Sequence, residues 1–586
     1  MKEKVTFQGK SLVFNALFVL LNLIGLALIV IGYHDNFQEQ SAWYTVIGLV
    51  VLLISIGGLL LFRGRLMMAS VARVLVGGIF IVSGLVKAND PIGFSYKLEE
   101  YFEDGALAFR IKEWFSAPGF SMEFLMDSAL LLSVLICIVE IVLGVLTIIG
   151  GKIKLVSYML LLMMLFFTFL TWHTANCDAT QKFVDHDTYL MTDPLAQLKL
   201  EDSKTNEELR IISQTDEELK VEEMKFPQCV DDCGCFGDAM KGSVGRSLTP
   251  KESFWKDIVL VYLVLWIFLA QWIIKPNTTK QNLAFAGSSI LVICFFSWVF
   301  GWYFPIFFGL ISIIAALWIL RVGGKFLGNY FGSILMIILI SVIMVGYVLM
   351  YLPLKDYRPY AVGSDLVEQM NDGVEGEYES LLVYVNKKTG ETKEYSATSL
   401  EYTESKIWED LDWKYESMVQ SVIVPTKIPS ITDQFNPFVD VNDISGFELK
   451  LPAVKEMYDN AKVDSTIGEI SIRDLIIESP RFVLVSSKNL MEGNWNNVDR
   501  LKGIQKACKK EGVPFAIICG ASREQINKFR KKYDLNAPIF VNDETELKAI
   551  SRSNPTLFVI EDGVVKAKYP FRSTPTKDKF ITKHLK

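Results

Sequence analysis

The chain has 586 residues, of which 51% are hydrophobic and 21% are charged, with a formal net charge of −7. The acidic balance leaves no basic surface for phosphates, so nucleic-acid binding is excluded. The 12% aromatic content excludes a disordered chain. A mean hydropathy of +0.30 in a chain with this many charges indicates two unlike parts, one apolar and one polar.

About nine apolar runs are long enough to cross a bilayer, which takes roughly 20 helical residues. Lys and Arg recur in every second connection between these runs, beginning with Lys2, Lys4 and Lys10. Because short basic loops stay on the cytoplasmic side, we expect a cytoplasmic N-terminus, and an odd number of spans places the C-terminal part on the opposite side. The expected spans are 12–32, 43–62, 69–87, 125–149, 153–173, 256–274, 283–302, 305–320 and 330–352.

Two charged residues lie deep within these runs, Arg73 in the third and Glu140 in the fourth. A lone charge in hydrocarbon is costly, and a rise of 1.5 Å per residue places both toward the cytoplasmic half. We therefore expect Arg73 and Glu140 to form an intramembrane ion pair. The pair is interpreted as a structural link between two helices, with a proton or substrate relay as the functional alternative.

The segment 174–255 connects the fifth and sixth spans and faces outward in this topology. It begins with an acidic stretch around 201–223 that we expect to be helical, and it carries four of the eight cysteines. These are Cys177, Cys229, Cys233 and Cys235. The other four, Cys137, Cys294, Cys508 and Cys519, are expected to be packing residues.

Three interpretations of the clustered cysteines stay open. One is a structural disulfide such as Cys177 to Cys229, since an outward compartment permits disulfides. A second is a redox-active pair, because Gly234 lets the backbone fold tightly enough to join Cys233 to Cys235 in a small, readily reduced ring. The third is a metal site in which cysteines are joined by His173, His186 or a nearby aspartate.

The run from Arg73 to Lys87, RVLVGGIFIVSGLVK, followed by Asp90-Pro-Ile-Gly93, resembles the first core helix of DoxX-like membrane proteins. Glu140-x3-Gly144 and Cys233-Gly-Cys-Phe-Gly237 resemble the related MauE (methylamine utilisation) branch. The resemblance covers about 69–274 and implies a four-helix membrane bundle. It also implies thiol redox chemistry in the maturation of periplasmic proteins, with the four loop cysteines as candidate catalytic residues.

The resemblance also raises a quinone as a cofactor. The in-membrane Cys-x-x-Cys of quinone-coupled enzymes is missing from this chain, so no cofactor is assigned, and no metal is assigned either. The expected partners are membrane lipid and a periplasmic protein or peptide client.

After Pro353 the chain turns polar. Alternating residues from Leu381 to Tyr395 around Asn386-Lys-Lys-Thr-Gly390 predict a hairpin. From about residue 480, short apolar strands alternate with helical patterns, which is typical of an α/β layer fold. The expected strands are Arg481–Ser487, Pro514–Cys519, Ile539–Val541 and Thr556–Ile560, and the expected helices are Asn496–Glu511, Arg523–Tyr533 and Glu544–Ser551.

The stretch from Ser553 to Gly563 is similar to the thioredoxin segment that carries its cis-proline, and this resemblance covers roughly 451–586. It implies a cis bond between Asn554 and Pro555. Where thioredoxins carry Cys-x-x-Cys, this chain reads Val485-Ser-Ser-Lys-Asn-Leu490, so the domain cannot exchange dithiols. It is interpreted as a docking module, with Asn554, Pro555 and Thr556 as the candidate surface for an extended client.

Together these observations predict a polytopic α-helical membrane protein with a C-terminal, extracytoplasmic α/β thioredoxin-like domain. We expect it in the bacterial inner membrane, acting in thiol–disulfide maturation of periplasmic proteins. The alternative is a non-enzymatic scaffold for envelope protein assembly with structural disulfides only. The expected parts are 1–68 (two spans), 69–274 (the DoxX/MauE-like bundle), 275–352 (three spans), 353–450 (a small strand-rich region) and 451–586 (the thioredoxin-like domain).

Overall fold

The computed structural model forms two compact units, Met1–Tyr357 and Arg358–Lys586. The residues that it describes are 2–32, 41–61, 64–117, 119–230, 236–240, 247–322, 330–424, 426, 429, 431, 438–440, 469–535 and 537–586.

Within these residues, nine helices of the first unit are long and apolar enough to cross a membrane. They confirm the expected spans, including the two shortest, and make the protein a polytopic helical membrane protein. The helices are α1 (Lys2–Gly32), α2 (Ser41–Leu61), α3 (Arg65–Asn89), α6 (Ala129–Ile149), α7 (Ile153–Ala175), α10 (Pro250–Ala270), α11 (Thr279–Val299), α12 (Phe304–Val322) and α14 (Tyr330–Met350).

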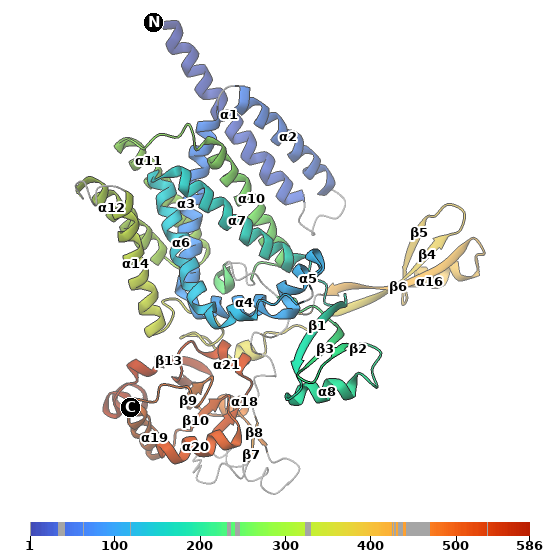
Figure 1. Ribbon diagram of the computed structural model, residues 1–586, viewed down its shortest axis with the longest axis vertical. Helices are drawn as coiled ribbons and strands as arrows, with labels where there is room; N and C mark the ends of the chain where they lie inside the picture. Colours follow the sequence, from blue (N-terminus) through green and yellow to red (C-terminus); the bar gives the residue numbers. More distant parts are fainter. Residues whose placement is uncertain are drawn as a thin grey trace. The chain divides into compact units, whose positions relative to one another are not determined.

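Helices α3 and α6 pack against each other at the centre of the bundle, as Figure 1 shows. Glycines let the two backbones approach closely. A Cβ atom added at Gly77 would meet the carbonyl oxygen of Gly144 at 3.0 Å, and one added at Gly84 would meet that of Cys137 at 3.1 Å. The helices α7, α10, α11, α12 and α14 surround this pair, whereas α1 and α2 form a hairpin that packs mainly on itself.

Two connections of this unit carry secondary structure of their own. The first holds α4 (Pro91–Phe102), η1 (Asp104–Ala108), α5 (Phe109–Phe115) and η2 (Glu123–Ser128). The second holds an antiparallel sheet of order β1-β3-β2, built from β1 (Phe183–Leu190), β2 (Leu209–Gln214) and β3 (Glu218–Lys225), with α8 (Pro194–Asp202) and η3 (Gly237–Met240).

The helix expected around 201–223 is therefore wrong over most of its length. Leu219 and Val221 alternate with polar residues along β3, and both are fully buried in a small cluster with Ala196 of α8. A period of two favours a strand. Glu218 and Lys220, on either side of Leu219, are exposed and occupy the solvent-facing side of that strand.

The second unit contains a five-stranded sheet of order β11-β10-β9-β12-β13. Its strands β9 (Arg481–Ser487), β10 (Phe515–Cys519) and β11 (Ile539–Val541) are parallel, and β12 (Thr556–Glu561) and β13 (Val564–Pro570) are antiparallel. The expected strands are confirmed to within one residue. The helices of this unit are α18 (Ile472–Glu478), α19 (Val498–Glu511), α20 (Arg523–Tyr533), α21 (Glu544–Ile550), α22 (Lys577–Phe580), η7 (Phe571–Ser573) and η8 (Ile581–Leu585).

Alternate residues of β9 point to opposite sides of this sheet. Phe482 and Leu484 belong to one buried hydrophobic cluster, whereas Val483 and Val485 belong to the other. Two apolar faces require cover on both sides. This explains why β9, as the central strand, reads as a continuous apolar run.

A separate antiparallel sheet has the order β5-β4-β6, with β4 (Glu377–Asn386), β5 (Thr392–Ser396) and β6 (Trp413–Val424). It confirms the expected hairpin, with Gly390 at a φ of 72° in the turn. Short elements beside it are α16 (Leu400–Ser405) and η4 (Ile407–Glu409), whereas β7 (Phe438–Asp440) and β8 (Glu469–Ser471) pair in a two-stranded sheet that contacts β11 and α18.

Residues between 358 and 370 join the five-stranded sheet. The amide of Gly363 donates to Val565 O at 2.8 Å, and that of Leu366, the first residue of α15 (Leu366–Met370), donates to Gly563 O at 2.9 Å. This part of the expected 353–450 region thus packs with the α/β fold. The expected boundary at residue 450 lies outside the described residues.

Candidate functional site

A disulfide joins Cys177 to Cys229, with the Cα atoms 5.6 Å apart. Cys177 follows α7 by two residues, and Cys229 lies four residues after β3. Both cysteines are half-buried. The adjoining amide of Gln228 donates to Gly105 O at 2.8 Å, so the bond lies where the cysteine-bearing segment meets η1 and the end of α7.

Cys233 and Cys235 lie outside the described residues. The chain re-enters the description at Phe236, which is buried between the side chains of other helices. Its ring centroid is 5.3 Å from that of Phe300, and the ammonium of Lys256 lies 5.1 Å from it. Of the residues described on either side, Val230 thus follows the disulfide directly, and Phe236 packs inside the helical bundle.

Among the described residues, the metal interpretation finds one group of potential ligands, and it contains no cysteine. Carboxylate oxygens of Asp104, Asp185 and Asp187 lie within 4.8 Å of one another. Lys112 and Lys225 lie among them: Lys112 Nζ contacts Asp185 and is 3.4 Å from Asp104, and Lys225 Nζ is 3.0 Å from Asp185. Two ammonium groups thus offset part of the negative charge of these three carboxylates.

This charge network lies between β1, β3, η1 and α5. Asp185 is fully buried. Burial acts to lower the pKa of Lys225, but hydrogen bonds to Asp187, Glu223 and Asp185 outweigh it and raise the pKa well above its ordinary value. Lys225 therefore stays charged. The sequence patterns gave no sign of the network, because its members come from four separate elements.

Among the described residues, neither histidine proposed as a metal ligand forms a cluster of potential ligands with the disulfide cysteines. His173 is fully buried against Phe109, with ring centroids 5.8 Å apart. Neither of its ring nitrogens has a hydrogen-bond partner in the part of the chain that the structure describes. His186 Nε2 lies 3.7 Å from Glu222.

Glu140 pairs with Lys87, and the expected pair with Arg73 is wrong. Lys87 Nζ lies 2.8 Å from Glu140 Oε1 and 3.0 Å from Oε2, and it donates to Ser83 Oγ at 2.8 Å. The side chains of Lys87 and Glu140 are 1% and 3% exposed. The ring of Phe167 lies 4.8 Å from the ammonium, so a charge pair sits in an otherwise apolar core.

The direction of side chains on antiparallel helices explains the error. Gly77 faces Gly144, and Gly84 faces Cys137, so Glu140 lies level with residue 81. Side chains on a helix lean toward its N-terminus. Those of Lys87 and Glu140 therefore lean toward each other, whereas that of Arg73 leans away from Glu140.

Arg73 binds backbone oxygens at the C-terminal end of α6 instead. Its Nε donates to Thr147 O at 2.9 Å, and its Nη2 donates to Ile148 O at 3.2 Å and to Asn277 Oδ1 at 3.0 Å. A helix leaves its last carbonyls without intrahelical partners and with partial negative charge. Arg73 satisfies two of them and acts as a C-terminal cap.

A second buried ionic group lies on α10. Lys256 contacts Asp257, whose Oδ2 also accepts a hydrogen bond from Thr171 of α7 at 3.1 Å. Asp257 is 1% exposed. In the sequence these two charges stand at the very start of the sixth apolar run.

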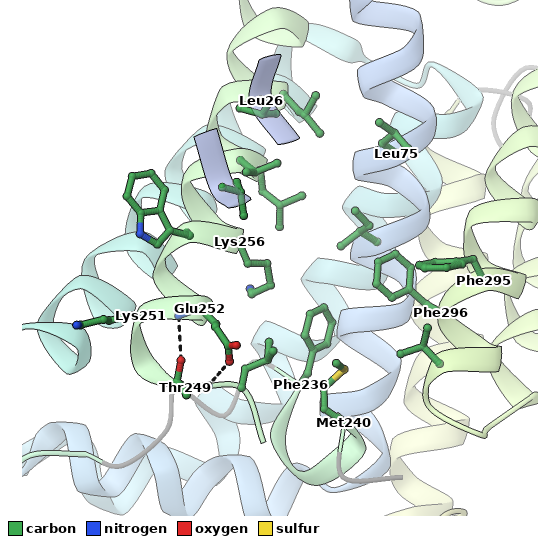
Figure 2. Close-up of a pocket in the computed structure, with 18 of the residues that line it drawn as sticks. Leu26, Leu75, Phe236, Met240, Thr249, Lys251, Glu252, Lys256, Phe295 and Phe296 are labelled. Atoms are coloured by element: carbon green, nitrogen blue, oxygen red, sulfur yellow. Dashed lines mark hydrogen bonds between the residues drawn. The ribbon is translucent and has the colours of Figure 1, made fainter. Parts of the chain in front are cut away.

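Lys256 also reaches into a pocket of about 800 Å³, which Figure 2 shows. Four helices, α1, α3, α10 and α11, together with η3 and Phe236, form its walls. Most of the lining is apolar, and its polar groups come from the start of α10. They are Thr249, Lys251, Glu252 and Lys256.

In the second unit, the bond between Asn554 and Pro555 is cis, as expected. The candidate docking surface is largely inside the fold, because Pro555 and Thr556 are buried. Asn554 is half-buried and already engaged: Ser487 Oγ donates to its Oδ1 at 2.6 Å, and its carbonyl accepts from the amide of Asn494 at 2.9 Å. Docking of a client at these three residues stays a prediction.

Cys508 and Cys519 are fully buried, and neither is in a disulfide. Burial raises the pKa of each thiol to about 12. Both stay protonated at neutral pH and are poor nucleophiles. They are packing residues, as expected.

The comparisons with known proteins concern the membrane unit alone. No curated protein sequence matches the chain. The model of the DoxX family matches residues 68–173, which span α3 to α7 and contain both Lys87 and Glu140. The protein therefore carries a DoxX-like region within a polytopic helical membrane protein.

Proposed function

We propose that this membrane protein takes part in thiol–disulfide maturation of periplasmic proteins at the bacterial inner membrane. The observation that carries the proposal is the half-buried disulfide between Cys177 and Cys229, in a segment with two further cysteines within six residues of Cys229. A partly exposed disulfide is open to attack by a thiolate. Cys233 and Cys235 supply thiols in the same segment.

The proposed step is disulfide transfer to a client. A client thiolate attacks one sulfur of a disulfide between Cys233 and Cys235, forms a mixed disulfide and releases the other sulfur as a thiolate. A second client thiolate then attacks the mixed disulfide. Two client thiols are oxidised to a disulfide, and one loop disulfide is reduced to two thiols, so electrons balance in this single transfer.

In this proposal the C-terminal α/β unit is a thioredoxin-like module that recruits the client. The supporting observations are the sheet order and the cis-proline. The loop after β9 contains no cysteine, and the two cysteines of this unit are buried. Its part is therefore recruitment, while the loop cysteines carry the chemistry.

One observation favours the alternative, a non-enzymatic scaffold. Cys177 and Cys229, which form the disulfide, are the pair expected for a structural disulfide. Their bond joins the end of α7 to the chain beyond β3. A staple of this kind stabilises a long connection without taking part in exchange.

Acid trapping followed by alkylation in intact cells separates the two. For the redox function, we expect a mixture of reduced and oxidised loop cysteines, and disulfide-linked clients that disappear in a Cys233→Ser, Cys235→Ser variant. Cys294→Ser is the matched control, because Cys294 lies within α11 and forms no disulfide. If the loop cysteines are always oxidised and no client is trapped in any variant, the redox function is wrong and the scaffold function is favoured.

A further inference from the structure

The pocket between α1 and the rest of the bundle has a volume of about 800 Å³, which lies within the range of ligand-binding pockets. Most of its lining is apolar. Because apolar surface is stabilised by contact with apolar groups rather than with water, the body of an occupant is hydrocarbon.

The pocket opens toward the lipid-facing surface of the bundle. Phe295 of α11 lines it and is 56% exposed. On α1, Leu26 lines the pocket, while the nearby Ile24 is 42% exposed on the outside of the helix. In a membrane these exposed side chains face acyl chains, so hydrocarbon from the bilayer can enter here.

The polar residues of the lining lie together, as an amphipathic occupant requires. Thr249 and Glu252 form a capping box at the start of α10, with Glu252 Oε2 accepting from the amide of Thr249 at 2.8 Å. Figure 2 shows this pair at one end of the pocket and Leu26 at the other, with the Lys256 side chain directed into the space between them. A molecule with one polar end and a long apolar body matches this order.

The occupant would also link parts of the fold that otherwise have few contacts. Hairpin α1–α2 packs on itself and reaches the bundle through a short polar chain. In that chain Tyr262 of α10 donates to Asn22 Oδ1 at 2.9 Å, and Asn22 donates to Ser55 Oγ at 3.0 Å. Since Leu23 and Leu263, which adjoin Asn22 and Tyr262, line the pocket, whatever fills it completes the packing of the hairpin.

We propose that the pocket is a binding site for one phospholipid of the surrounding bilayer. Its acyl chain lies between α1, α3, α10 and α11, and its glycerol and headgroup region lies beside the first turns of α10. This lipid holds the N-terminal hairpin on the DoxX-like bundle. The site is independent of the loop cysteines, so it stands whether or not these carry out disulfide exchange.

Native mass spectrometry of the full chain, extracted in mild detergent, tests the site. The wild type is expected to retain one phospholipid. Leu26→Trp, which fills the pocket from α1, is expected to reduce the retained fraction at least tenfold. The matched control is Ile24→Trp on the outside of the same helix, which is expected to retain the lipid as the wild type does.

A second measurement covers the case that Leu26→Trp does not fold. Delipidated wild-type protein is titrated with dioleoylphosphatidylglycerol, and its thermal unfolding temperature is expected to rise by several degrees. Equal retention by Leu26→Trp and the wild type, absence of any bound lipid together with no thermal shift, or recovery of an isoprenoid quinone as the bound molecule would each overturn the proposal.

Discussion

The contacts of Lys87 and Glu140 show how a charge pair is kept inside an apolar bundle. Each carboxylate oxygen lies within 3.0 Å of the ammonium, which also binds Ser83 Oγ. The Phe167 ring adds a favourable face for the cation. The pair therefore needs no water, which the surrounding side chains exclude.

Removing one partner should be much worse than removing both. Lys87→Met leaves a buried carboxylate without its ammonium, and we expect a loss of about 3–5 kcal/mol in the free energy of unfolding. The double variant Lys87→Met, Glu140→Met should lie close to the wild type, because no charge is left unpaired. Thermal or denaturant unfolding in detergent measures both changes.

The matched control is Lys97→Met, which breaks the more exposed pair between Lys97 and Glu100, 2.8 Å apart. Pairs in contact with water contribute about 0–1 kcal/mol. If the double variant is as unstable as Lys87→Met, the ion pair between Lys87 and Glu140 is not what stabilises the bundle. Their contacts with other residues would then do so.

At the scale of elements, local patterns predicted most of the fold. Apolar runs of about 20 residues identified the nine spans, and strands such as β9 could be located because their apolar runs are bounded by polar turns. The segment 201–223 misled, since acidic residues of high helix propensity hide the alternation of Leu219 and Val221. This segment forms strands because Leu219 and Val221 are buried against α8. A short window of sequence gives no information on that long-range contact.

The last helical turn, η8, gives the second unit a dependence on pH. His584 is 8% exposed, and its ring nitrogen is 2.8 Å from the hydroxyl of Tyr569 on β13. Burial, and then the charge of Lys583, lowers the pKa of His584. The folded unit thus takes up this proton less readily than the unfolded chain does.

The sign follows from that difference. The stability that neutral His584 contributes is fully present above its unfolded pKa of about 6.5 and is lost as the pH falls below that value. Hydrogen exchange of β13 amides in the full chain should show less protection at pH 5.5 than at pH 7.5. His584→Gln should weaken this dependence, and the exposed Lys579→Gln should leave it unchanged. An equal dependence in His584→Gln would assign it to another group.

At the scale of the whole molecule, assembly was the part that sequence could not supply. The pocket takes its walls from five places in the chain, α1, α3, η3, α10 and α11, and no periodicity reports how they meet. The same holds for Glu140: its partner Lys87 is 53 residues away in the chain, and their pairing depends on the register of α3 and α6. The number of spans and the charges of the loops between them, by contrast, can be read from the sequence, and they predict the membrane topology.

The number of spans leads to the last prediction. Nine helices in the described residues can cross the membrane, and an odd number places the two ends of the chain on opposite sides. The lysines at the start of α1 and the basic connections, such as Lys152 with Lys154 and Arg321 with Lys325, predict a cytoplasmic N-terminus. An epitope after Lys586 should therefore bind antibody in intact spheroplasts, whereas an epitope before α1 should bind only after permeabilisation. Binding of both under the same condition would mean an even number of spans. If the helix that does not cross is α10, α11, α12 or α14, the loop cysteines and the α/β unit would not share a compartment, which the proposed recruitment of clients requires.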